Sequence, residues 1–493
     1  MKISYVQMKV AAGRPDVNTE KILKFIDKAQ NGGADVVIFP EYAISGNFIA
    51  NEESFRRDCE LFKEKIFSTA KNIKIVLGET FSSKNFDVIF NSNPFSLDKN
   101  IHAEKITRPT IYVGAVGVQN TGKTLYTFDG NSVAYNSRGE VVQRAEPFAE
   151  CINFIELEDI DKIPALNLPE ISETEKIYRA ISYGVKTFLA QIGINKVVIG
   201  VSGGIDSAVA AALYVQVVGA QNVFLVNMPS KFNSSTTKNL SELLAKNLGC
   251  KYFVVPIQES VDWTVKQLEE RGIEVSSFVK ENIQARDRSS RILAAIAASV
   301  GGVFTCNANK AESTVGYATL YGDAAGFLSA LADLWKYQVY DLARYMNEEI
   351  YGFKAIPQGI IDIVPSAELS TAQNVDEGKG DPLKYPYHDY LLKAFAENNS
   401  TPEDILKFYA EKSLERQIGC EAGLIDKYFP SAQDFITDLE RWWRQFKGMG
   451  VAKRIQSPPI LAVTEKPYGA HSEPQNGVYF TQNYLELKKE LLT

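Results

Sequence analysis

The stretch VVIGVSGGIDSAVAAALYVQVVG, residues 197–219, joins an apolar run to a glycine-rich hexapeptide and then to a second apolar run. The β-branched residues before the glycines predict a buried strand over 196–201. The apolar residues after them predict a helix from Ala208 to Val218, which Gly219 ends. Glycine lets the backbone approach a ligand closely, and the free N–H groups at a helix start attract phosphate. The stretch therefore predicts a phosphate-binding turn between a strand and a helix.

The segments on either side of this turn continue the alternation of strands and helices. They predict an amphipathic helix over 177–192, strands over 223–228 and 252–257, and a helix over 240–248. A β-α-β-α-β order is typical of an α/β domain with a parallel, doubly wound, Rossmann-like sheet. After about residue 395 the pattern predicts helices rich in aromatic residues.

The N-terminal part of the chain predicts a separate α/β domain. Strands are expected over 3–6, 34–39, 73–77 and 88–90, and helices around 22–29 and 55–66. From 110 to 142 the pattern is hairpin-like, with turns at Asp129-Gly130 and Arg138-Gly139. We therefore expect a first domain at 1–155, a linker at 156–173, a main domain at 174–395 and a helical extension and tail at 396–493.

Composition excludes several classes of protein. The 493 residues carry a formal net charge of -7, which argues against a general nucleic-acid binder. Five widely spaced cysteines without a CxxC pair, and only three histidines, disfavour a disulfide framework or a zinc site and favour reduced thiols in the cytoplasm. No apolar run is long enough to span a membrane, and the strand-like start MKISYVQMKV predicts no signal peptide.

The hexapeptide Ser202 to Ser207 carries more chemistry than a tight turn requires. It places two hydroxyls and one carboxylate at the mouth of a helix, yet lacks the GxxxxGK[ST] and GxGxxG spacings. It resembles the pyrophosphate loop of the ATP pyrophosphatase group, which includes NAD synthetase, GMP synthetase and asparagine synthetase. Further motifs select among them: NIQAR (282–286), NKAE (309–312), VGY (315–317), TLYGD (319–323), DLWK (333–336), PSAEL (365–369) and KRIQ (453–456). In that order they resemble the NAD synthetase family.

The resemblance implies a reaction and a set of roles. The carboxylate of deamido-NAD would attack ATP to give an adenylate and pyrophosphate, and ammonia would then displace AMP. Asp206 and Glu312 would hold Mg²⁺, and Asp206, Asp323 and Lys336 would act in catalysis. ATP contacts are expected at Gly200, Val201, Ser202, Gly203, Gly204, Ile205, Asp206, Ser207, Asn307, Lys336 and Ser366. Substrate contacts are expected at Asn282, Arg286, Glu312 and Lys453, and Asn307 stands where the family usually has Thr or Ser.

Structural explanations for single residues stay open at this point. A lysine such as Lys336, or a helical glutamate such as Glu312, is more often a solvated surface charge than a ligand. Arg286 is followed by Asp287 and Arg288, so it could belong to a surface charge cluster. Only the shared order of the motifs favours the functional reading.

The first domain resembles a nitrilase-type amidase in shortened form. The resemblance rests on Gln7, Asn18, Gly33-Ala34-Asp35, Phe39-Pro40-Glu41, the segment 91–95 and the segment 128–132. In full-length NAD synthetases this α/β sandwich hydrolyses glutamine with a Glu, a Lys and a nucleophilic Cys. Here Glu41 is present, but the segment for Lys and Cys looks deleted between Leu77 and Val88, and Gly78 falls at the position of the Cys. Neither Cys59 nor Cys151 fits the role.

The sequence thus predicts an ammonia-dependent NAD synthetase with a degenerate first domain, in which Glu41 is a structural relic. Free ammonia, rather than glutamine, is expected as the direct nitrogen source, and a separate glutaminase partner could supply it. Amidation of a mononucleotide to NMN and a scaffolding role remain as alternatives. A cytoplasmic homo-oligomer, a dimer or larger, is expected because soluble enzymes commonly form closed symmetric assemblies.

Overall fold

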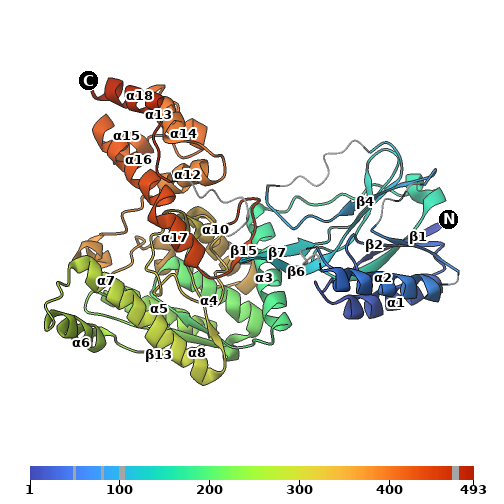
Figure 1. Cartoon of the computed structure of the whole chain (residues 1–493), viewed down its shortest axis with the longest axis horizontal. Helices are drawn as coiled ribbons and strands as arrows, with labels where there is room; N and C mark the ends of the chain where they lie inside the picture. Colours follow the sequence, from blue (N-terminus) through green and yellow to red (C-terminus); the bar gives the residue numbers. More distant parts are fainter. Residues whose placement is uncertain (48–51, 71, 79–80, 82, 99–105, 469–476) are drawn as a thin grey trace. The chain divides into compact units, whose positions relative to one another are not determined.

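The computed structural model describes residues 1–47, 52–70, 72–78, 81, 83–98, 106–468 and 477–493 (Figure 1). The chain forms two compact units. Unit 1 comprises Met1–Phe188 with Ala462–Glu465, and unit 2 comprises Leu189–Leu461 with Lys466–Thr493. The division falls within helix α3 (Glu173–Gln191). The domain limits expected from the sequence stay a prediction.

Unit 1 is an α/β sandwich of two sheets covered by helices. The first sheet has the order β10-β1-β2-β3, with β1 and β2 parallel and β10 antiparallel to β1. The second has the order β4-β5-β8-β9, and β6 and β7 form a hairpin. The elements are β1 (Lys2–Gln7), α1 (Pro15–Asn31), β2 (Val36–Phe39), α2 (Glu53–Thr69), β3 (Lys74–Leu77), β4 (Asp87–Asn91), β5 (Thr110–Gly114), β6 (Val116–Thr121), β7 (Thr124–Asp129), β8 (Val133–Tyr135), β9 (Val141–Arg144) and β10 (Cys151–Glu156).

Alternation along β1 explains why this unit has two cores. Ile3 and Tyr5 are buried with residues of β5 between the two sheets, whereas Val6 packs with Ile22 of α1 on the other face. Successive residues of a strand point to opposite faces, so an almost wholly apolar strand must be covered on both sides. The predicted nitrilase-like α/β sandwich is confirmed.

The hairpin-like pattern predicted for residues 110–142 is only partly right. The Arg138-Gly139 turn does join the antiparallel pair β8 and β9. At Asp129-Gly130, however, the chain passes from β7 in one sheet to β8 in another. Gly130 has φ +72°, and a Cβ there would lie 2.2 Å from the side chain of Gln7. The turn therefore changes sheets, which the local DG signal cannot distinguish from a hairpin.

Unit 2 is built on a parallel sheet of four strands in the order β13-β12-β11-β14. The elements are β11 (Val197–Gly200), α4 (Ile205–Val218), β12 (Val223–Asn227), α5 (Ser235–Leu248), β13 (Lys251–Val254), α6 (Gln258–Glu269), α7 (Ser277–Arg286), α8 (Ala294–Val300), β14 (Val303–Phe304), α9 (Lys310–Val315), α10 (Lys336–Tyr345) and α11 (Gln358–Asp362). The predicted doubly wound sheet is confirmed. β12 lies on one side of β11 and β14 on the other, and such a switch point opens a crevice at the carboxyl ends of the strands.

The remaining helices of unit 2 surround a core of aromatic side chains. They are α12 (Tyr385–Ala396), α13 (Pro402–Ala410), α14 (Leu414–Ile418), α15 (Leu424–Tyr428), α16 (Ala432–Lys447), α17 (Met449–Gln456) and α18 (Gln482–Leu492). Along α16, Phe435, Leu439, Trp442 and Phe446 recur at helical spacing and are buried in this core. The helical, aromatic-rich part expected after residue 395 is present, but α18 and the short strand β15 (Ile460–Ala462) were not predicted.

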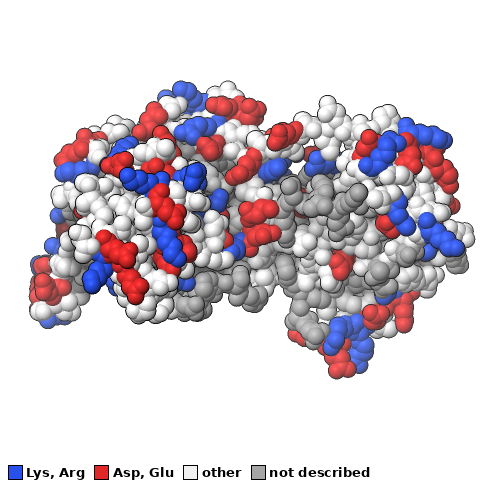
Figure 2. Space-filling view, turned by 90° about the horizontal axis from the view of Figure 1, so that it is seen from above, with Lys and Arg blue, Asp and Glu red and all other residues white. Residues whose placement is uncertain are grey.

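The surface carries charges of both signs (Figure 2), and the cysteines form no disulfides. Acidic and basic side chains are interspersed over the face that Figure 2 displays. All five cysteines are free thiols. Among the described helices, none combines the length and the hydropathy that a membrane crossing would need.

Candidate functional site

A pocket of about 240 Å³ opens at the carboxyl end of β11, where the strand order reverses. Its wall brings together residues from β11, α4, α9, the segment after β14 and the loop before α10. The predicted site residues that line it are Gly200, Val201, Ser202, Asp206, Ser207, Asn307, Glu312 and Asp323. Residues more than a hundred positions apart in the sequence therefore share one cavity.

The glycine-rich loop forms one wall of this pocket. Gly203 has φ +88°, and a Cβ there would lie 2.4 Å from the carbonyl oxygen of Thr237 on α5. The Ser202 hydroxyl accepts a hydrogen bond from the Gly204 amide at 3.2 Å, and the Ser207 hydroxyl donates to the Gly204 carbonyl at 3.1 Å. The predicted residues Gly203 and Gly204 thus shape the turn, while Ile205 is buried in the core behind it.

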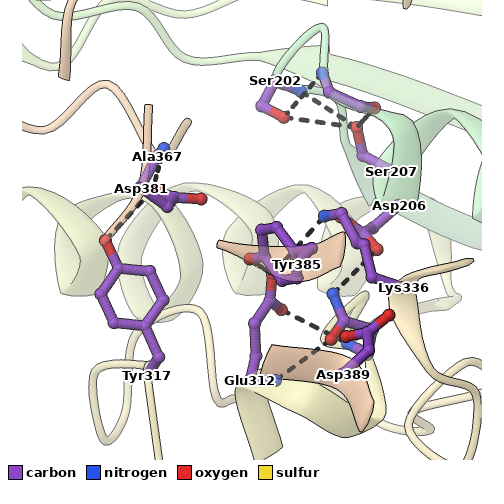
Figure 3. A network of polar contacts seen from close by, with 12 residues as sticks. Ser202, Asp206, Ser207, Glu312, Tyr317, Lys336, Ala367, Asp381, Tyr385 and Asp389 are labelled. Atoms are coloured by element: carbon purple, nitrogen blue, oxygen red, sulfur yellow. Dashed lines mark hydrogen bonds and ion pairs between the residues drawn. The ribbon is translucent and has the colours of Figure 1, made fainter. Parts of the chain in front are cut away.

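A charged cluster contributes Asp206 and Glu312 to the wall of the pocket, and Lys336 lies between them (Figure 3). The Lys336 ammonium is 2.5 Å from Oδ2 of Asp206 and 3.8 Å from Oε1 of Glu312. Asn309 donates to Oδ1 of Asp206 at 3.1 Å and also caps α9 through the Glu312 amide. The Tyr385 hydroxyl donates to Glu312 at 3.3 Å, and its ring centroid lies 4.7 Å from the Lys336 nitrogen.

Burial makes the ionisation of this cluster unusual. Burial, and next the Asp206 carboxylate, raise the pKa of Glu312 to about 8, although Lys336 opposes them. Burial lowers the pKa of Lys336, but the Asp206 and Glu312 carboxylates outweigh it, so that its pKa is raised overall. At neutral pH the cluster therefore combines a fixed ammonium with a carboxyl that readily binds a proton or another cation.

A buried ion triad lies beside the cluster. The Lys310 ammonium of α9 is fully buried and sits 2.7 Å from Asp333 and 2.7 Å from Glu397, which follows α12. The Trp335 indole N–H also donates to Glu397, at 2.9 Å. The Lys310 ammonium thus links α9 to the segment just before α10 and to the residue that follows α12. Glu312, Lys336 and Tyr385 lie on these three helices.

A second pocket of about 190 Å³ adjoins the first. The two share Ala318, Asp323, Ala367 and Leu369 in their walls. Asn282 and Lys453, both predicted substrate contacts, line the second pocket. The Lys453 ammonium donates to the carbonyls of Gly316 at 2.7 Å and Ala318 at 2.5 Å. The two pockets together offer a continuous cavity for a ligand with two ends.

Six predicted residues line neither pocket: Gly203, Gly204, Ile205, Arg286, Lys336 and Ser366. Arg286 is exposed at the end of α7 and donates to the Leu320 carbonyl at 3.1 Å. The Ser366 hydroxyl turns to the carbonyl of Gln373, at 2.7 Å, and closes its own loop. Neither Arg286 nor Ser366 lines the pocket for which it was predicted. Arg286 instead hydrogen-bonds the backbone of the TLYGD loop, and Ser366 hydrogen-bonds the backbone of its own loop.

Sequence reasoning missed several polar residues that the fold brings to the site. Arg288 lines the first pocket and donates to the Met228 carbonyl at 3.0 Å and to Asn233 at 3.2 Å. Burial lowers its pKa to about 10. Asn309 could have been found, because Asn-x-x-Glu is a capping-box pattern that predicts the start of α9. Tyr385 and Asp389, on α12, are not adjacent to any motif and carried no local signal.

In unit 1 the structure shows the surroundings of the expected amidase residues. Glu41 follows β2 and Gly78 follows β3, and a Cβ at Gly78 would lie 2.3 Å from the Glu41 Cα. Burial raises the pKa of both the Cys59 and Cys151 thiols. The deletion predicted between Leu77 and Val88 includes residues 79–80 and 82, which lie outside the described residues.

Comparison with known proteins agrees with these motifs. The family described as NAD synthase matches residues 177–420. The glutamine-dependent NAD(+) synthetase of Synechocystis is 31% identical over 401 residues, which cover 78% of this chain and 65% of that protein. The glutamine-dependent NAD(+) synthetase of Xylella fastidiosa is 26% identical over 562 residues, covering 95% of this chain and 97% of that protein. The chain thus spans less than two thirds of the first relative and nearly all of the second.

A solved structure supports the fold along the whole chain. The crystal structure of a glutamine-dependent NAD(+) synthetase from Cytophaga hutchinsonii superposes with a TM-score of 0.78. The superposition covers 100% of this chain and 99% of that one at 12% sequence identity. At this identity the similarity supports the fold of each unit and says nothing about activity.

The relatives overturn the predicted nitrogen source. Both are named as glutamine-dependent, and the Xylella protein aligns with nearly the whole chain, unit 1 included. The prediction of an ammonia-dependent enzyme, with glutamine used only through a separate glutaminase, is therefore wrong. The prediction failed because it depended on finding Lys and Cys at fixed positions in a pattern of strands. A fold can bring catalytic groups together from segments that such a pattern does not align.

The family assignment rests on three agreements. The NAD synthase match covers the parallel sheet of unit 2 and every residue that lines the first pocket. The relatives extend the similarity into the nitrilase-like sandwich, and the solved structure has the same two folds in one chain. Residues 177–420 therefore match the NAD synthase family, and the chain is similar over most of its length to glutamine-dependent NAD(+) synthetases.

Proposed function

We propose that the first pocket catalyses the ATP-dependent amidation of deamido-NAD to NAD, with release of AMP and pyrophosphate. The observation that carries the proposal is the contact of Lys336 with both Asp206 and Glu312 at the mouth of a glycine-rich loop. The first step brings the substrate carboxylate to the ATP phosphate, so two anions must meet. Pre-organised positive charge and N–H donors lower the barrier to such a step.

Each wall of the pocket has a part in this proposal. The amides at the start of α4, with the hydroxyls of Ser202 and Ser207, would bind phosphate oxygens. Lys336 would neutralise charge as pyrophosphate leaves. Asn307, whose amide nitrogen lies 3.5 Å from the Gly200 carbonyl, would hydrogen-bond the nucleotide beside β11. Asp323, in the wall shared by both pockets, would position the reacting end of the substrate.

Asp206 and Glu312 suit Mg²⁺. Magnesium ions at phosphate sites use one or two carboxylates and complete their shell with phosphate oxygens and water. The two carboxylates face the same ammonium, and the raised pKa of Glu312 marks a carboxyl that gains from a second cation. When bound, the ion would supply charge neutralisation between the phosphates. Asp206 and Glu312 would hold it, and Asn309 would keep Asp206 in place.

The second pocket would receive the rest of the dinucleotide. Asn282 and Lys453 line it, together with Trp442 of α16. Polar groups at one end and an aromatic ring at the other fit a nucleotide with both phosphates and a base. The contiguity of the pockets favours deamido-NAD over a mononucleotide, since a mononucleotide would leave the second pocket unfilled.

Glutamine is the nitrogen source that the names of the relatives support. On this proposal unit 1, as the nitrilase-like part, would release ammonia from glutamine. The experiment is to assay NAD formation with glutamine and, separately, with ammonium, and to measure glutamate. We expect NAD and glutamate in equal amounts with glutamine. NAD formation with ammonium but not with glutamine would contradict this part of the proposal and leave the synthetase site unaffected.

We also propose that the chain forms a cytoplasmic homo-oligomer. β13 is the edge strand of the sheet in unit 2, and its Phe253 and Val254 are 42% and 55% exposed. Trp263 of α6 is 61% exposed. Exposed apolar groups at a sheet edge favour association. Light scattering should give a mass of at least two chains, and a monodisperse monomer would contradict the proposal.

The decisive test of the synthetase proposal follows the nucleotide products. With deamido-NAD, ATP, Mg²⁺ and glutamine as the nitrogen source, the chain should form NAD, AMP and pyrophosphate in equal amounts. Nicotinate mononucleotide serves as the control substrate and should react poorly. Release of ADP and phosphate would overturn the proposal, because the loop would then act as a different kind of phosphate site.

A further inference from the structure

Helix α12 contacts the charged cluster through one face. Tyr385 and Asp389 are four residues apart, so they lie on the same side of the helix. Tyr385 touches both Glu312 and Lys336, as described above. Asp389 reaches the beginning of α10, where its Oδ2 accepts a hydrogen bond from the Tyr337 amide at 2.9 Å. Figure 3 draws Asp389 together with Lys336 and Asp206.

This hydrogen bond acts on the turn that carries Lys336. Lys336 is the first residue of α10 and Tyr337 the second. The first N–H groups of a helix have no partner within the helix and need an acceptor from elsewhere. Trp335 precedes α10, and an indole N–H is a donor that cannot accept. Gln338 of α10 itself accepts from the Trp335 amide at 3.0 Å, whereas the acceptor for the Tyr337 amide comes from α12.

The arrangement is costly for stability. Asp389 is 1% exposed, and within the described part of the chain its Oδ1 has no hydrogen-bond partner. Burial raises the pKa of Asp389 to about 7. A buried, half-satisfied carboxyl costs free energy that an uncharged residue would avoid. Residues that break a rule of packing or hydrogen bonding beside a site are candidates for a functional role.

We propose that Asp389 is a positioning residue, which fixes the first turn of α10 so that the Lys336 ammonium stays between Asp206 and Glu312. This inference rests on the proposed function for the consequence of that position. Asp389 acts through the backbone of α10 and touches no reacting atom. Tyr385 restrains the other end of the same lysine, because its ring faces the ammonium. Helix α12 thus holds Lys336 at both ends.

The kinetic test compares three variants. Asp389→Ala removes the acceptor and should lower kcat by about tenfold to a hundredfold, since small displacements in a charged site are costly. Asp389→Asn keeps an oxygen acceptor for the Tyr337 amide and should restore most of kcat. Thr401→Ala removes a cap of α13, where Thr401 accepts from the Asp404 amide at 3.3 Å, far from either pocket wall. It should lower thermal stability and leave kcat unchanged.

Stability separates positioning from a purely structural role. Asp389→Asn should match or exceed the wild type in melting temperature, because it removes a buried charge, and should keep most of kcat. Asp389→Ala also removes the buried charge, so it should lose kcat with little loss of melting temperature. A purely structural residue would lose stability and activity together. If Asp389→Ala and Thr401→Ala behave alike in kcat, the proposal is overturned.

A second readout does not depend on the reaction. Lys336 is 4% exposed and ion-paired, so reductive methylation should label it slowly, with Lys266 of α6, 65% exposed, as the internal reference. Mass spectrometry should show faster labelling of Lys336 in Asp389→Ala and no change in Thr401→Ala. Unchanged labelling in Asp389→Ala would overturn the positioning role. Absence of NAD formation by the wild type would instead defeat the proposed function and leave the labelling test intact.

Discussion

The glycine-rich loop and the charged cluster face the same pocket but are built in different ways. The loop consists of six consecutive residues, Ser202 to Ser207, the last three of which begin α4, and its two serine hydroxyls form hydrogen bonds within the hexapeptide. The cluster combines Asp206, Glu312, Lys336 and Tyr385 from four helices, across 180 residues of sequence. The loop presents backbone donors with fixed geometry, whereas the cluster presents formal charges that depend on distant packing.

The difference separates two kinds of vulnerability. The loop depends on backbone conformation. Adding a Cβ at Gly203 should therefore impair its function, whereas substitutions elsewhere in the loop should be tolerated. The cluster depends on burial and mutual neutralisation, so removing one charge leaves its neighbours uncompensated. Substitutions in the cluster should therefore have larger effects than substitutions in the loop. Substitutions in the helices that support the cluster should have the smallest.

The largest effect is expected at the charges themselves. Lys336→Ala and Glu312→Gln should each lower the rate of NAD formation by at least about a hundredfold, the scale for losing one pre-organised charge. Steady-state kinetics with saturating ATP and deamido-NAD would measure it. Lys266→Ala is the control, because Lys266 is exposed and pairs with Glu270 at the end of its own helix. Near-normal rates in both cluster variants would mean that these charges do not serve the reaction.

An intermediate effect is expected in the loop. Gly203→Ala should weaken ATP binding by about tenfold or more, because its Cβ would displace the loop and the donors it presents. Gly249, which ends α5, is a matched control with φ +68° and nothing within 4 Å of an added Cβ. Both variants should lose about 1–2 kcal/mol of stability through the left-handed backbone. Calorimetry would measure the ATP affinity of both variants. Equal affinities would show that ATP binding does not depend on the backbone conformation of the loop, and so would contradict the proposed difference between loop and cluster.

The smallest effect concerns the support of α12. His388 is buried; its Nδ1 accepts from the Lys384 amide at 2.7 Å, and its Nε2 lies 2.8 Å from Asp438. Burial lowers the pKa of His388 below its usual 6.5, more than Asp438 raises it. The folded chain then binds this proton less tightly than the unfolded chain does. The stabilising contribution is complete above pH 6.5 and is lost as the pH falls below that value.

Urea unfolding between about pH 5 and pH 8 tests this linkage. Below pH 6.5 the wild type should lose up to about 1.4 kcal/mol per pH unit through His388. His388→Gln, which cannot titrate, should show a shallower decline over the same range. Parallel curves for the two proteins would show that His388 does not couple the packing of α12 to pH.

The same contrast explains how far the sequence could be read. The fold class and the loop were predictable, because a strand, a glycine turn and a helix are encoded in consecutive residues. Asp206, Glu312 and Lys336 were grouped only through family motifs, and the structure brings them together. Their roles in binding ATP and metal remain predictions. The order of the family motifs grouped these three residues, and no pattern of neighbouring residues could have done so.

The failures have physical reasons of their own. Arg286 was favoured over Arg288, yet two residues along a helix turn the side chain by more than half a circle, and Arg288 faces the pocket. Asp389 and Tyr385 lie on α12. The amphipathic pattern of this helix predicts which face is buried, but not which other elements that face contacts. The nitrogen source was misjudged because a missing local pattern was taken as a missing activity.

The ion triad of Lys310, Asp333 and Glu397 has a consequence for how this site can evolve. Lys310 and Asp333 are fully buried, and the Glu397 side chain is 12% exposed. Replacing any one of the three leaves a charge without its counterion in the interior, which commonly costs about 3–5 kcal/mol. A lineage therefore cannot exchange these residues one at a time, although an apolar replacement of the whole set could fold well. Such epistasis makes changes in α9, α10 and α12 depend on one another, and Glu312, Lys336 and Tyr385 lie on these three helices.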